Sequence, residues 1–319
     1  RKNRPKSGLA TQHLAGLEAL TRLCNGKLEG DFLGSEEISF YSGEITPQPL
    51  KVKIETAGSI TLVLQALLIP SLFAPGTIKI NFQGGATDTF FSPPIDYFRF
   101  VFLPMLEKII ESLPNPKGGK IKIDIPRRGF YPEGGAEVEV EVTPLEIFQK
   151  KEKTLSLENR GELKRILVIS GASDSLKERK VAERQISGAR ETPLFYKKAK
   201  LPIETKIEYY DSFSTGSQIT IIGEFEESIL GASALGKIGK SSEEVGKEAA
   251  MEFLRETKEL VFVDKHFSDQ ILPYIALLTK SAKITTSEIT QHTKTNIWVI
   301  EKFIDGKFEI RENSISWKS

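Results

Sequence analysis

One histidine lies where a reactive side chain is expected, between a predicted strand and a predicted helix. His292 follows residues 283–287, which alternate like a strand, and precedes residues 297–304, whose apolar side chains recur at helical spacing. Thr295 or Asn296 is a candidate N-cap, so we expect His292 in the connecting loop. The start of a helix offers free backbone N–H groups to phosphate, and a histidine there can act as base, acid or nucleophile. Packing or helix capping is the alternative interpretation.

Basic residues at the start of the chain are a second candidate for phosphate chemistry. Arg1, Arg4 and Lys6 lie close together in sequence, and guanidinium groups bind phosphate oxygens through paired hydrogen bonds. A solvated basic segment is the alternative. The chain begins without Met and without a signal-peptide pattern, so we expect residues upstream of Arg1 to be missing from this sequence.

Amide and carboxylate side chains supply further candidates for ligand binding. Gln12 and Gln65 interrupt faces otherwise rich in Ala and Leu, and a buried amide needs partners from the protein or from a ligand. Asp269 and Gln270 lie at the start of a predicted helix, where they could cap it or recognise a base or ribose. Pro93 stiffens the Gly-rich loop before it, which could let the backbone approach a nucleotide or simply turn the chain.

Composition excludes several classes of protein. Of the 319 residues 39% are hydrophobic and 27% charged, as in globular proteins, and no apolar run is long enough to span a membrane. The single Cys24 excludes an intramolecular disulfide framework and a cysteine-based zinc site, and it favours a reducing, cytoplasmic setting. The net charge of +1 means that nucleic-acid binding needs a local patch. Because His13, His266 and His292 are the only histidines, a three-histidine metal site would need all of them.

Behind these residues the sequence predicts strands and helices in a repeated order. One complete unit of strand, helix, strand, helix and two strands is expected at about residues 50–145. Its final parts recur at residues 266–317 and its second half at residues 1–46, although chance similarity among alternating elements is an alternative. The elements of the complete unit are expected at residues 50–54, 58–68, 77–82, 95–113, 120–125 and 136–142.

A segment whose predicted elements do not follow this repeated order separates the second copy from the third. Strands are predicted at residues 166–169, 203–210 and 218–223, and charged helices at 176–186 and 245–254. Ser241 and Glu244 form a capping box for the second helix. We therefore predict an α+β fold of three repeated units, each with a four-stranded sheet and two helices, plus a small inserted α+β domain. The large domain is expected at residues 1–147 and 260–319, with its first unit truncated, and the insert at residues 148–259.

Several separate motifs, in the right order along the whole chain, resemble the RNA 3′-terminal phosphate cyclases. They include Arg1-Lys-Asn-Arg4-Pro-Lys, Gln12-His13-Leu, Thr56-Ala-Gly-Ser59, Gly84-Gly85-Ala-Thr-Asp88, Ser92-Pro93-Pro94-Ile-Asp96-Tyr, Gly129-Phe-Tyr-Pro-Glu-Gly-Gly135 and His292-Thr-Lys-Thr-Asn296. The resemblance implies the repeated-unit fold with an insert in its third copy. It also implies ATP-dependent conversion of an RNA 3′-terminal phosphate to a 2′,3′-cyclic phosphate, through a histidyl-AMP enzyme and an adenylylated RNA end.

The resemblance also implies roles for individual residues. His292 matches the family's nucleophile. Arg1 and Arg4 match its phosphate-binding arginines, and Gln12 and Gln65 its active-site glutamines. The family's adenine pocket falls on Pro93 and on a segment containing His266, Asp269 and Gln270, where His266 departs from the usual aromatic residue. A divalent metal, Mg or Mn, is expected with ATP, and the carboxylate that helps to hold it in the family would lie before Arg1.

Three other functions compete with this interpretation. A catalytically silent, cyclase-like RNA-binding protein of ribosome assembly would lack the nucleophilic histidine that His292 supplies. An enolpyruvyl transferase uses the same unit but usually needs six copies. A plain RNA-binding module explains Arg1 and Arg4 but not the nucleotide-pocket motifs. We expect RNA with a 3′-terminal phosphate and ATP as the partners, with no membrane and no obligate protein partner.

Overall fold

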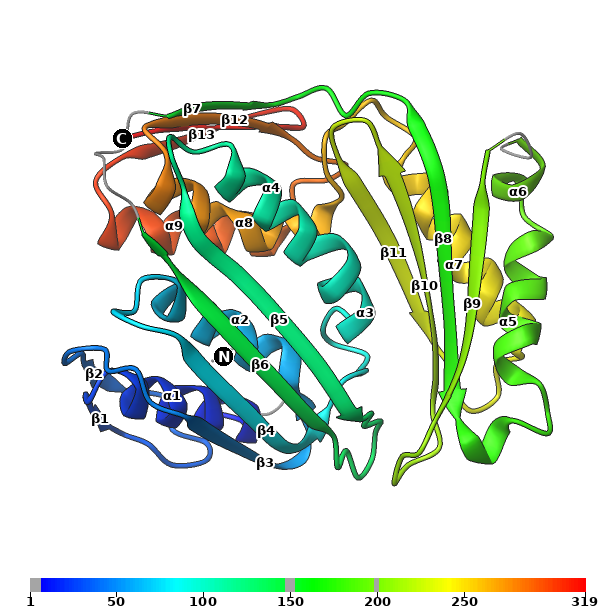
Figure 1. Ribbon diagram of the computed structural model, residues 1–319, viewed down its shortest axis with the longest axis horizontal. Helices are drawn as coiled ribbons and strands as arrows, with labels where there is room; N and C mark the ends of the chain where they lie inside the picture. The colour runs from blue at the N-terminus through cyan, green and yellow to red at the C-terminus, as the bar shows by residue number, and fades with distance from the viewer. Residues whose placement is uncertain (1–6, 147–152, 198–200) are drawn as a thin grey trace.

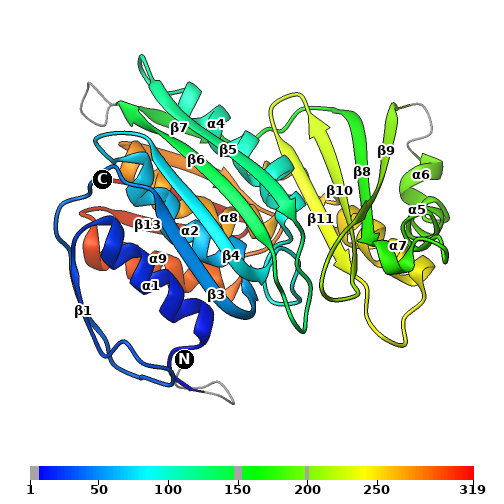
Figure 2. The same ribbon diagram turned by 60° about the horizontal axis from the view of Figure 1, so that its bottom comes forward.

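The computed structural model describes residues 7–146, 153–197 and 201–319, so Arg1 and Arg4 lie outside the described residues. Figures 1 and 2 show two four-stranded sheets with helices packed between them, and a third four-stranded sheet with its own helices beside this pair. The strands of one sheet lie within residues 50–146, and those of the sheet with its own helices lie within residues 163–235. The remaining sheet takes one strand from residues 154–157 and the other three from residues 281–318. This mixture of sheets and helices confirms the predicted α+β class.

The central unit is the complete copy that the sequence predicts. Its sheet has the order β3-β4-β6-β5, in which β3 and β4 are parallel and the other neighbours antiparallel. Inward-facing residues of β3 are apolar, whereas those between them are exposed, because side chains alternate along a strand. Its elements are β3 (Leu50–Ser59), α2 (Ile60–Leu72), β4 (Ile78–Ala86), α3 (Ile95–Tyr97), a π-helical turn η1 (Phe98–Phe102), α4 (Leu103–Glu111), β5 (Lys117–Arg127) and β6 (Glu137–Glu146).

The C-terminal unit repeats this order and the same pairings. Its sheet runs β7-β12-β14-β13, with β7 and β12 parallel and the other neighbours antiparallel. The opening strand β7 was not predicted, because four residues give too short an alternation to recognise. It lies inside the span expected for the insert, so the exact boundaries of the insert stay a prediction. The elements are β7 (Thr154–Leu157), α8 (Lys265–Leu278), β12 (Ser281–Thr285), α9 (Gln291–Phe303), β13 (Lys307–Arg311) and β14 (Ser314–Lys318).

Before β3, the described residues form one helix and a short two-stranded sheet. Helix α1 (Thr11–Leu23) packs on α2 and β3. Residues 32–41 are mostly loop, and only the end of this segment is a strand. This strand is β2 (Ser39–Tyr41), which pairs antiparallel with β1 (Lys27–Glu29).

The third sheet, of order β11-β10-β8-β9, carries two principal helices and has its own core. The predicted capping box is present: the Ser241 hydroxyl accepts a hydrogen bond from the Glu244 backbone N–H at 3.2 Å, and Glu244 accepts one from the Ser241 N–H at 2.8 Å. The elements are β8 (Leu163–Ser173), α5 (Val181–Arg190), α6 (Pro193–Lys197), β9 (Ile203–Tyr210), β10 (Ser217–Phe225), β11 (Ile229–Leu235) and α7 (Ser242–Glu256), with a 3-10 turn η2 (Asp174–Leu176) before α5.

Candidate active site

His292 lies in the first turn of α9, not in the loop before it. The helix begins at Gln291 with Thr290 as its N-cap, so the predicted caps Thr295 and Asn296 are wrong by more than one turn. The Thr290 hydroxyl accepts a hydrogen bond from the Thr293 backbone N–H at 3.1 Å, which satisfies one of the free donors of the first turn. The His292 side chain is exposed and makes no hydrogen bond within the described part of the chain. It is therefore free to react.

Asp269 of α8 holds this first turn in place. Its Oδ1 accepts hydrogen bonds from the hydroxyls of Thr290 at 2.7 Å and Thr293 at 2.5 Å. Its backbone carbonyl accepts a third, from the Asn296 side-chain amide at 2.5 Å. Asp269 is largely buried, so these contacts connect the interior of α8 to the turn that carries His292.

Gln65 and Gln270, two of the predicted site residues, are hydrogen-bonded to each other. Gln65 of α2 donates from Nε2 to Oε1 of Gln270 of α8 at 2.6 Å, although the residues are far apart in sequence. Gln270 in turn donates to the backbone carbonyl of His266 at 2.9 Å. The structure therefore brings Gln65, Gln270 and His266 together, as a shared site requires.

His266 is exposed at the start of α8, edge-on to the ring of Tyr97, with ring centroids 6.0 Å apart and planes at 83°. The Tyr97 hydroxyl donates to the Asp264 carboxylate at 2.5 Å. Asp264 also accepts from the backbone N–H of Phe267 at 2.9 Å and of Gly231 at 3.0 Å. Burial, followed by the charge of Asp264, raises the pKa of Tyr97 well above its usual value, so this phenol stays a donor.

Gln12 and Pro93 are held at the start of α2. The Gln12 Oε1 accepts a hydrogen bond from the Ser59 backbone N–H at 2.9 Å, and Ser59 caps α2 by accepting from the Leu62 N–H at 3.2 Å. The Thr61 hydroxyl donates to the Pro93 carbonyl at 2.9 Å. The first turns of α2, α8 and α9 are thus linked to the predicted residues by direct contacts.

The histidines do not form a metal site. His13 accepts a hydrogen bond from the Ala10 backbone N–H at its Nδ1, at 3.1 Å, and so caps α1. Among the residues that the structure describes, no three His, Cys, Asp or Glu side chains are grouped so that they could bind a metal ion. The described residues therefore do not fit a metal held by the protein alone.

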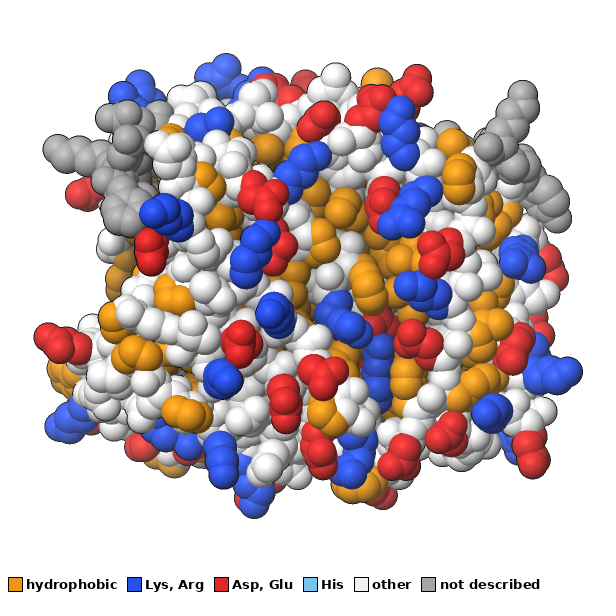
Figure 3. Space-filling view, viewed as in Figure 1, with side chains coloured by type: hydrophobic (Ala, Val, Ile, Leu, Met, Phe, Trp, Pro, Cys, Tyr) orange, Lys and Arg blue, Asp and Glu red, His pale blue; other side chains and the backbone are white. Residues whose placement is uncertain are grey.

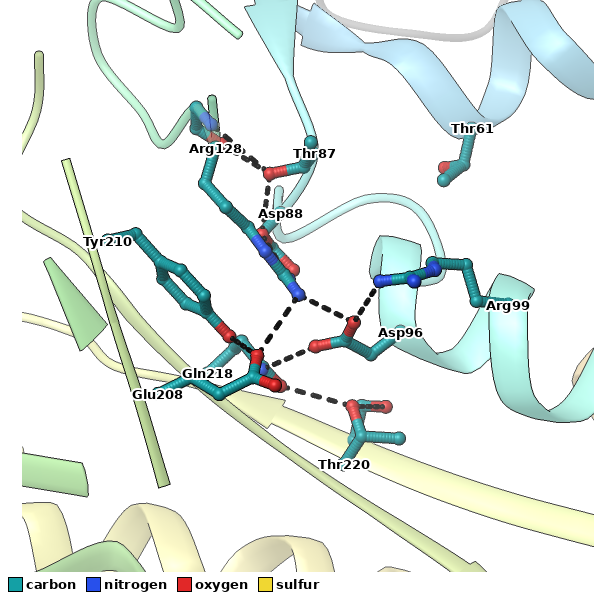
Figure 4. A network of polar contacts seen from close by, with 12 residues as sticks. Thr61, Thr87, Asp88, Asp96, Arg99, Arg128, Glu208, Tyr210, Gln218 and Thr220 are labelled. Atoms are coloured by element: carbon teal, nitrogen blue, oxygen red, sulfur yellow. Dashed lines mark hydrogen bonds and ion pairs between the residues drawn. The ribbon is translucent and has the colours of Figure 1, made fainter. Parts of the chain in front are cut away.

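A buried charge network behind the site was not predicted (Figure 4). Arg128 is paired with Asp96 at 2.6 Å and with Asp88 at 3.4 Å, and its guanidinium lies 4.4 Å from the centre of the Tyr210 ring. Gln218 of β10 donates to the second oxygen of Asp96 at 2.7 Å. The only sequence signals were Asp88 and Asp96 on either side of Pro93 and the two consecutive arginines Arg127 and Arg128.

Burial determines the charge states of this network. Removal from water would by itself lower the pKa of Arg128, but Asp96 and Asp88 outweigh it and keep the guanidinium protonated. Burial raises the pKa of Asp88 to about 6, against the opposing charge of Arg128. Oδ1 of Asp88 is buried and has no hydrogen-bond partner in the described structure, which is consistent with a carboxyl group that is costly to ionise.

Comparison with known proteins identifies the class to which this site belongs. A sequence model of the family described as RNA 3′-terminal phosphate cyclase matches residues 1–310. A protein of that name from Pyrococcus furiosus is 42% identical over 312 residues, covering 98% of this chain and 85% of the relative. Another from Thermococcus kodakarensis is 40% identical over 311 residues, covering 97% and 84%. One from Archaeoglobus fulgidus is 37% identical over 316 residues, covering 99% and 88%.

The chain belongs to the RNA 3′-terminal phosphate cyclase family. The resemblance seen in the sequence is thereby confirmed, together with the prediction that the protein is an enzyme. Within the described residues, no helix has the length and apolar character that crossing a membrane requires.

Proposed function

We propose that the protein uses ATP to convert the 3′-terminal phosphate of an RNA into a 2′,3′-cyclic phosphate, through a covalent intermediate on His292. The observation that carries this proposal is the exposed imidazole of His292 in the first turn of α9. Asp269 of α8 binds this turn, and its neighbour Gln270 binds Gln65 of α2. Helix N-termini attract phosphate. The family and the names of its members support the same reaction.

The first step forms the enzyme–AMP. A nitrogen of His292 attacks the α-phosphorus of ATP, the new P–N bond replaces the bond to the β-phosphate oxygen, and pyrophosphate leaves. Exposure of the side chain permits this attack. We propose that Arg1 and Arg4, which lie outside the described residues, bind the phosphates and stabilise their charge.

The next two steps transfer AMP and close the ring. An oxygen of the RNA 3′-phosphate attacks the phosphorus of the enzyme–AMP, so the P–N bond breaks and His292 is released. The neighbouring 2′-OH then attacks the phosphorus of the activated 3′-phosphate and loses its proton. The anhydride bond breaks, and AMP leaves with its electron pair.

The remaining predicted residues have supporting roles in this proposal. We expect His266 and Pro93 to contact the adenine, with Gln65 and Gln270 beside them. Gln12 holds the start of α2. Asp269 positions α9, since both of its hydroxyl partners lie in that helix turn. Mg or Mn would neutralise the charge of the triphosphate and would be coordinated mainly by its oxygens; no step above depends on a metal ligand of this chain.

Three RNA strands that differ only at the 3′ end test the proposed reaction. With ATP and Mg or Mn, a strand ending in a 3′-phosphate should acquire a cyclic end. A terminal 2′-deoxy sugar leaves no internal nucleophile, so that strand should retain AMP. A 3′-OH strand should not react. Conversion of the 3′-OH strand, or AMP release from the ribose strand without a cyclic end, would rule the mechanism out; gel or mass analysis measures the products.

A further inference from the structure

Four exposed aromatic rings lie on three loops at one end of the molecule. Phe90 and Phe91, in the loop after β4, are 54% and 92% exposed; Tyr131, between β5 and β6, is 68% exposed; and Phe213, between β9 and β10, is 59% exposed. Grouped exposed aromatic side chains are typical of interaction sites rather than of ordinary surface. These four rings are called the aromatic end below.

The three loops are held together by direct contacts. The Thr87 backbone N–H donates to the Gly129 carbonyl at 3.0 Å, which joins the first loop to the second. The Glu133 N–H donates to the Ser214 hydroxyl at 2.9 Å, which joins the second loop to the third. Figures 1 and 2 both show the β5–β6 and β9–β10 turns side by side. The three loops that carry the aromatic end are therefore neighbours.

A glycine brings the Phe213 ring against the second loop. An added Cβ at Gly135 would lie 2.2 Å from the Phe213 ring, and Gly135 has a φ of +72°. Any larger residue would push the ring away and strain the turn. The position of the Phe213 ring is thus defined by packing on one face, while more than half of its surface faces solvent.

One arginine lies against these rings. The Arg127 guanidinium lies 4.8 Å from the centre of the Phe213 ring. Arg127 also lines a hollow of about 280 Å³ with Arg99, Arg128, Tyr209 and Tyr210. Figure 3 shows basic and hydrophobic side chains interleaved on the surface between the central sheet and the third sheet, with acidic side chains beside them. Glu208 and Asp211 also line the hollow, so its net positive charge is small.

The aromatic end is continuous with the proposed active site. Phe91 and Pro93 are two residues apart in one loop, and the Thr61 hydroxyl ties that loop to the first turn of α2. We propose that the aromatic end binds the single-stranded RNA nucleotides that precede the terminal phosphate, by stacking bases on Phe91, Tyr131 and Phe213. This rests on the proposed function. Exposed aromatic rings with a guanidinium group beside one of them suit bases and a phosphate, and stacking is tolerant of sequence because every base has a flat face.

The test measures RNA binding and enzyme–AMP formation separately. The probe is an oligoadenylate ending in a 3′-phosphate, and its affinity is measured by fluorescence anisotropy without ATP. Phe91→Ala and Phe213→Ala should each weaken binding about tenfold, the scale of one lost stacking contact. Phe213→Leu, which keeps apolar packing on Gly135, should weaken it similarly. Phe303→Ala is the matched control, because Phe303 is 85% exposed at the far end of α9 from His292.

A second comparison assigns the effect to bases. An oligonucleotide with abasic sugars at the positions before the terminal phosphate should bind more weakly to the wild type, and the ring substitutions should then cost nothing further. The salt dependence should be shallow, since few cations face the strand. Labelling with ATP in the absence of RNA should be unchanged in all ring variants.

The outcomes distinguish this inference from the proposed function. Unchanged RNA affinity in Phe91→Ala and Phe213→Ala overturns the inference and leaves a protein-docking role for the rings. Loss of ATP labelling in Phe91→Ala overturns it for that ring and places Phe91 in the nucleotide pocket. If the wild type forms no enzyme–AMP while the ring variants still lose RNA affinity, the proposed reaction fails and the RNA-binding surface stands.

Discussion

Asp269 positions the helix turn that carries His292 through contacts with other residues of that turn. Its Oδ1 accepts hydrogen bonds from two hydroxyls of α9, and its backbone carbonyl accepts one from Asn296. A carboxylate that contacted ribose or metal would need its charge, whereas a positioning residue needs only an acceptor oxygen. The two roles therefore make different predictions for an amide at this position.

Asp269→Ala should slow enzyme–AMP formation strongly, by about tenfold or more, because α9 loses both hydroxyl contacts. It should also lower the free energy of unfolding by about 1–3 kcal/mol, since buried donors lose their acceptor. Asp269→Asn keeps an acceptor oxygen and should retain most of the labelling rate. Equal losses in both variants would show that the charge itself is required. Rapid-quench labelling and urea unfolding measure the two effects.

The raised pKa of Asp88 means that the free energy of unfolding should depend on pH. Burial raises its pKa from 3.8 to about 6, so the folded state binds this proton more tightly than the unfolded chain between these values. The free energy of unfolding should therefore fall as the pH rises from about 3 to 7, by about 3 kcal/mol from this group. Urea unfolding of the wild type and of Asp88→Asn across this interval measures it. The difference in the free energy of unfolding between the wild type and Asp88→Asn should shrink as the pH rises. A difference that does not change with pH would contradict the raised pKa of Asp88.

At the scale of elements, the first turn of α9 depends on its cap. Thr290→Ala removes the acceptor for the Thr293 N–H and a hydroxyl donor to Asp269, so it should lower the free energy of unfolding by about 1 kcal/mol. The labelling rate should fall as well, because His292 lies two residues later. Thr290→Ser keeps the hydroxyl and should behave like the wild type. A normal labelling rate in Thr290→Ala would show that this cap does not affect the labelling of His292.

The order of elements could be predicted from the sequence because the core-facing positions repeat. The alternation in β3 and the apolar helix α2 are local patterns, and both were identified within a few residues of their observed bounds. Strand β7 has only four residues and its partner β12 is more than a hundred residues away, so no local pattern could identify it. The insertion after β7 separates the strand from the rest of its unit.

The start of α9 shows the same limit at the site. Thr290, Thr295 and Asn296 are all acceptable caps by residue type. The choice of Thr290 depends on Asp269, whose carboxylate binds Thr290 and Thr293 together. That contact joins two helices and is invisible in either segment alone. Residue types thus supplied the candidate side chains of the site, whereas tertiary contacts determine where these side chains lie.

At the scale of the whole molecule, buried charges join the central unit to the third sheet. Arg128 neutralises Asp88 and Asp96 and stacks on Tyr210 of β9, while Gln218 of β10 binds Asp96. Asp264 adds a second connection, from the cap of α8 to the backbone of Gly231 in β11. The sheet inserted between β7 and α8 is thereby fixed against the elements that carry the site.

Arg128→Met should be severely destabilising, by about 3–5 kcal/mol, because it leaves two buried carboxylates without their cation. Arg127→Met is the adjacent control: Arg127 is partly exposed and pairs with Glu137, so its loss should cost about 0–1 kcal/mol. Equilibrium urea unfolding gives both values. Similar small losses for the two arginines would mean that the buried network does not stabilise this connection.

The central claim is that His292 becomes covalently linked to AMP. The most direct measurement is incubation with ATP labelled at the α-phosphate, followed by mass analysis of the modified peptide, using the full natural chain. We expect one adduct, on His292, that is labile in acid and stable in base as a phosphoramidate should be. It should be absent from His292→Ala, whose exposed position leaves folding unaffected. An acid-stable adduct, a label on another residue, or full labelling of His292→Ala would contradict it.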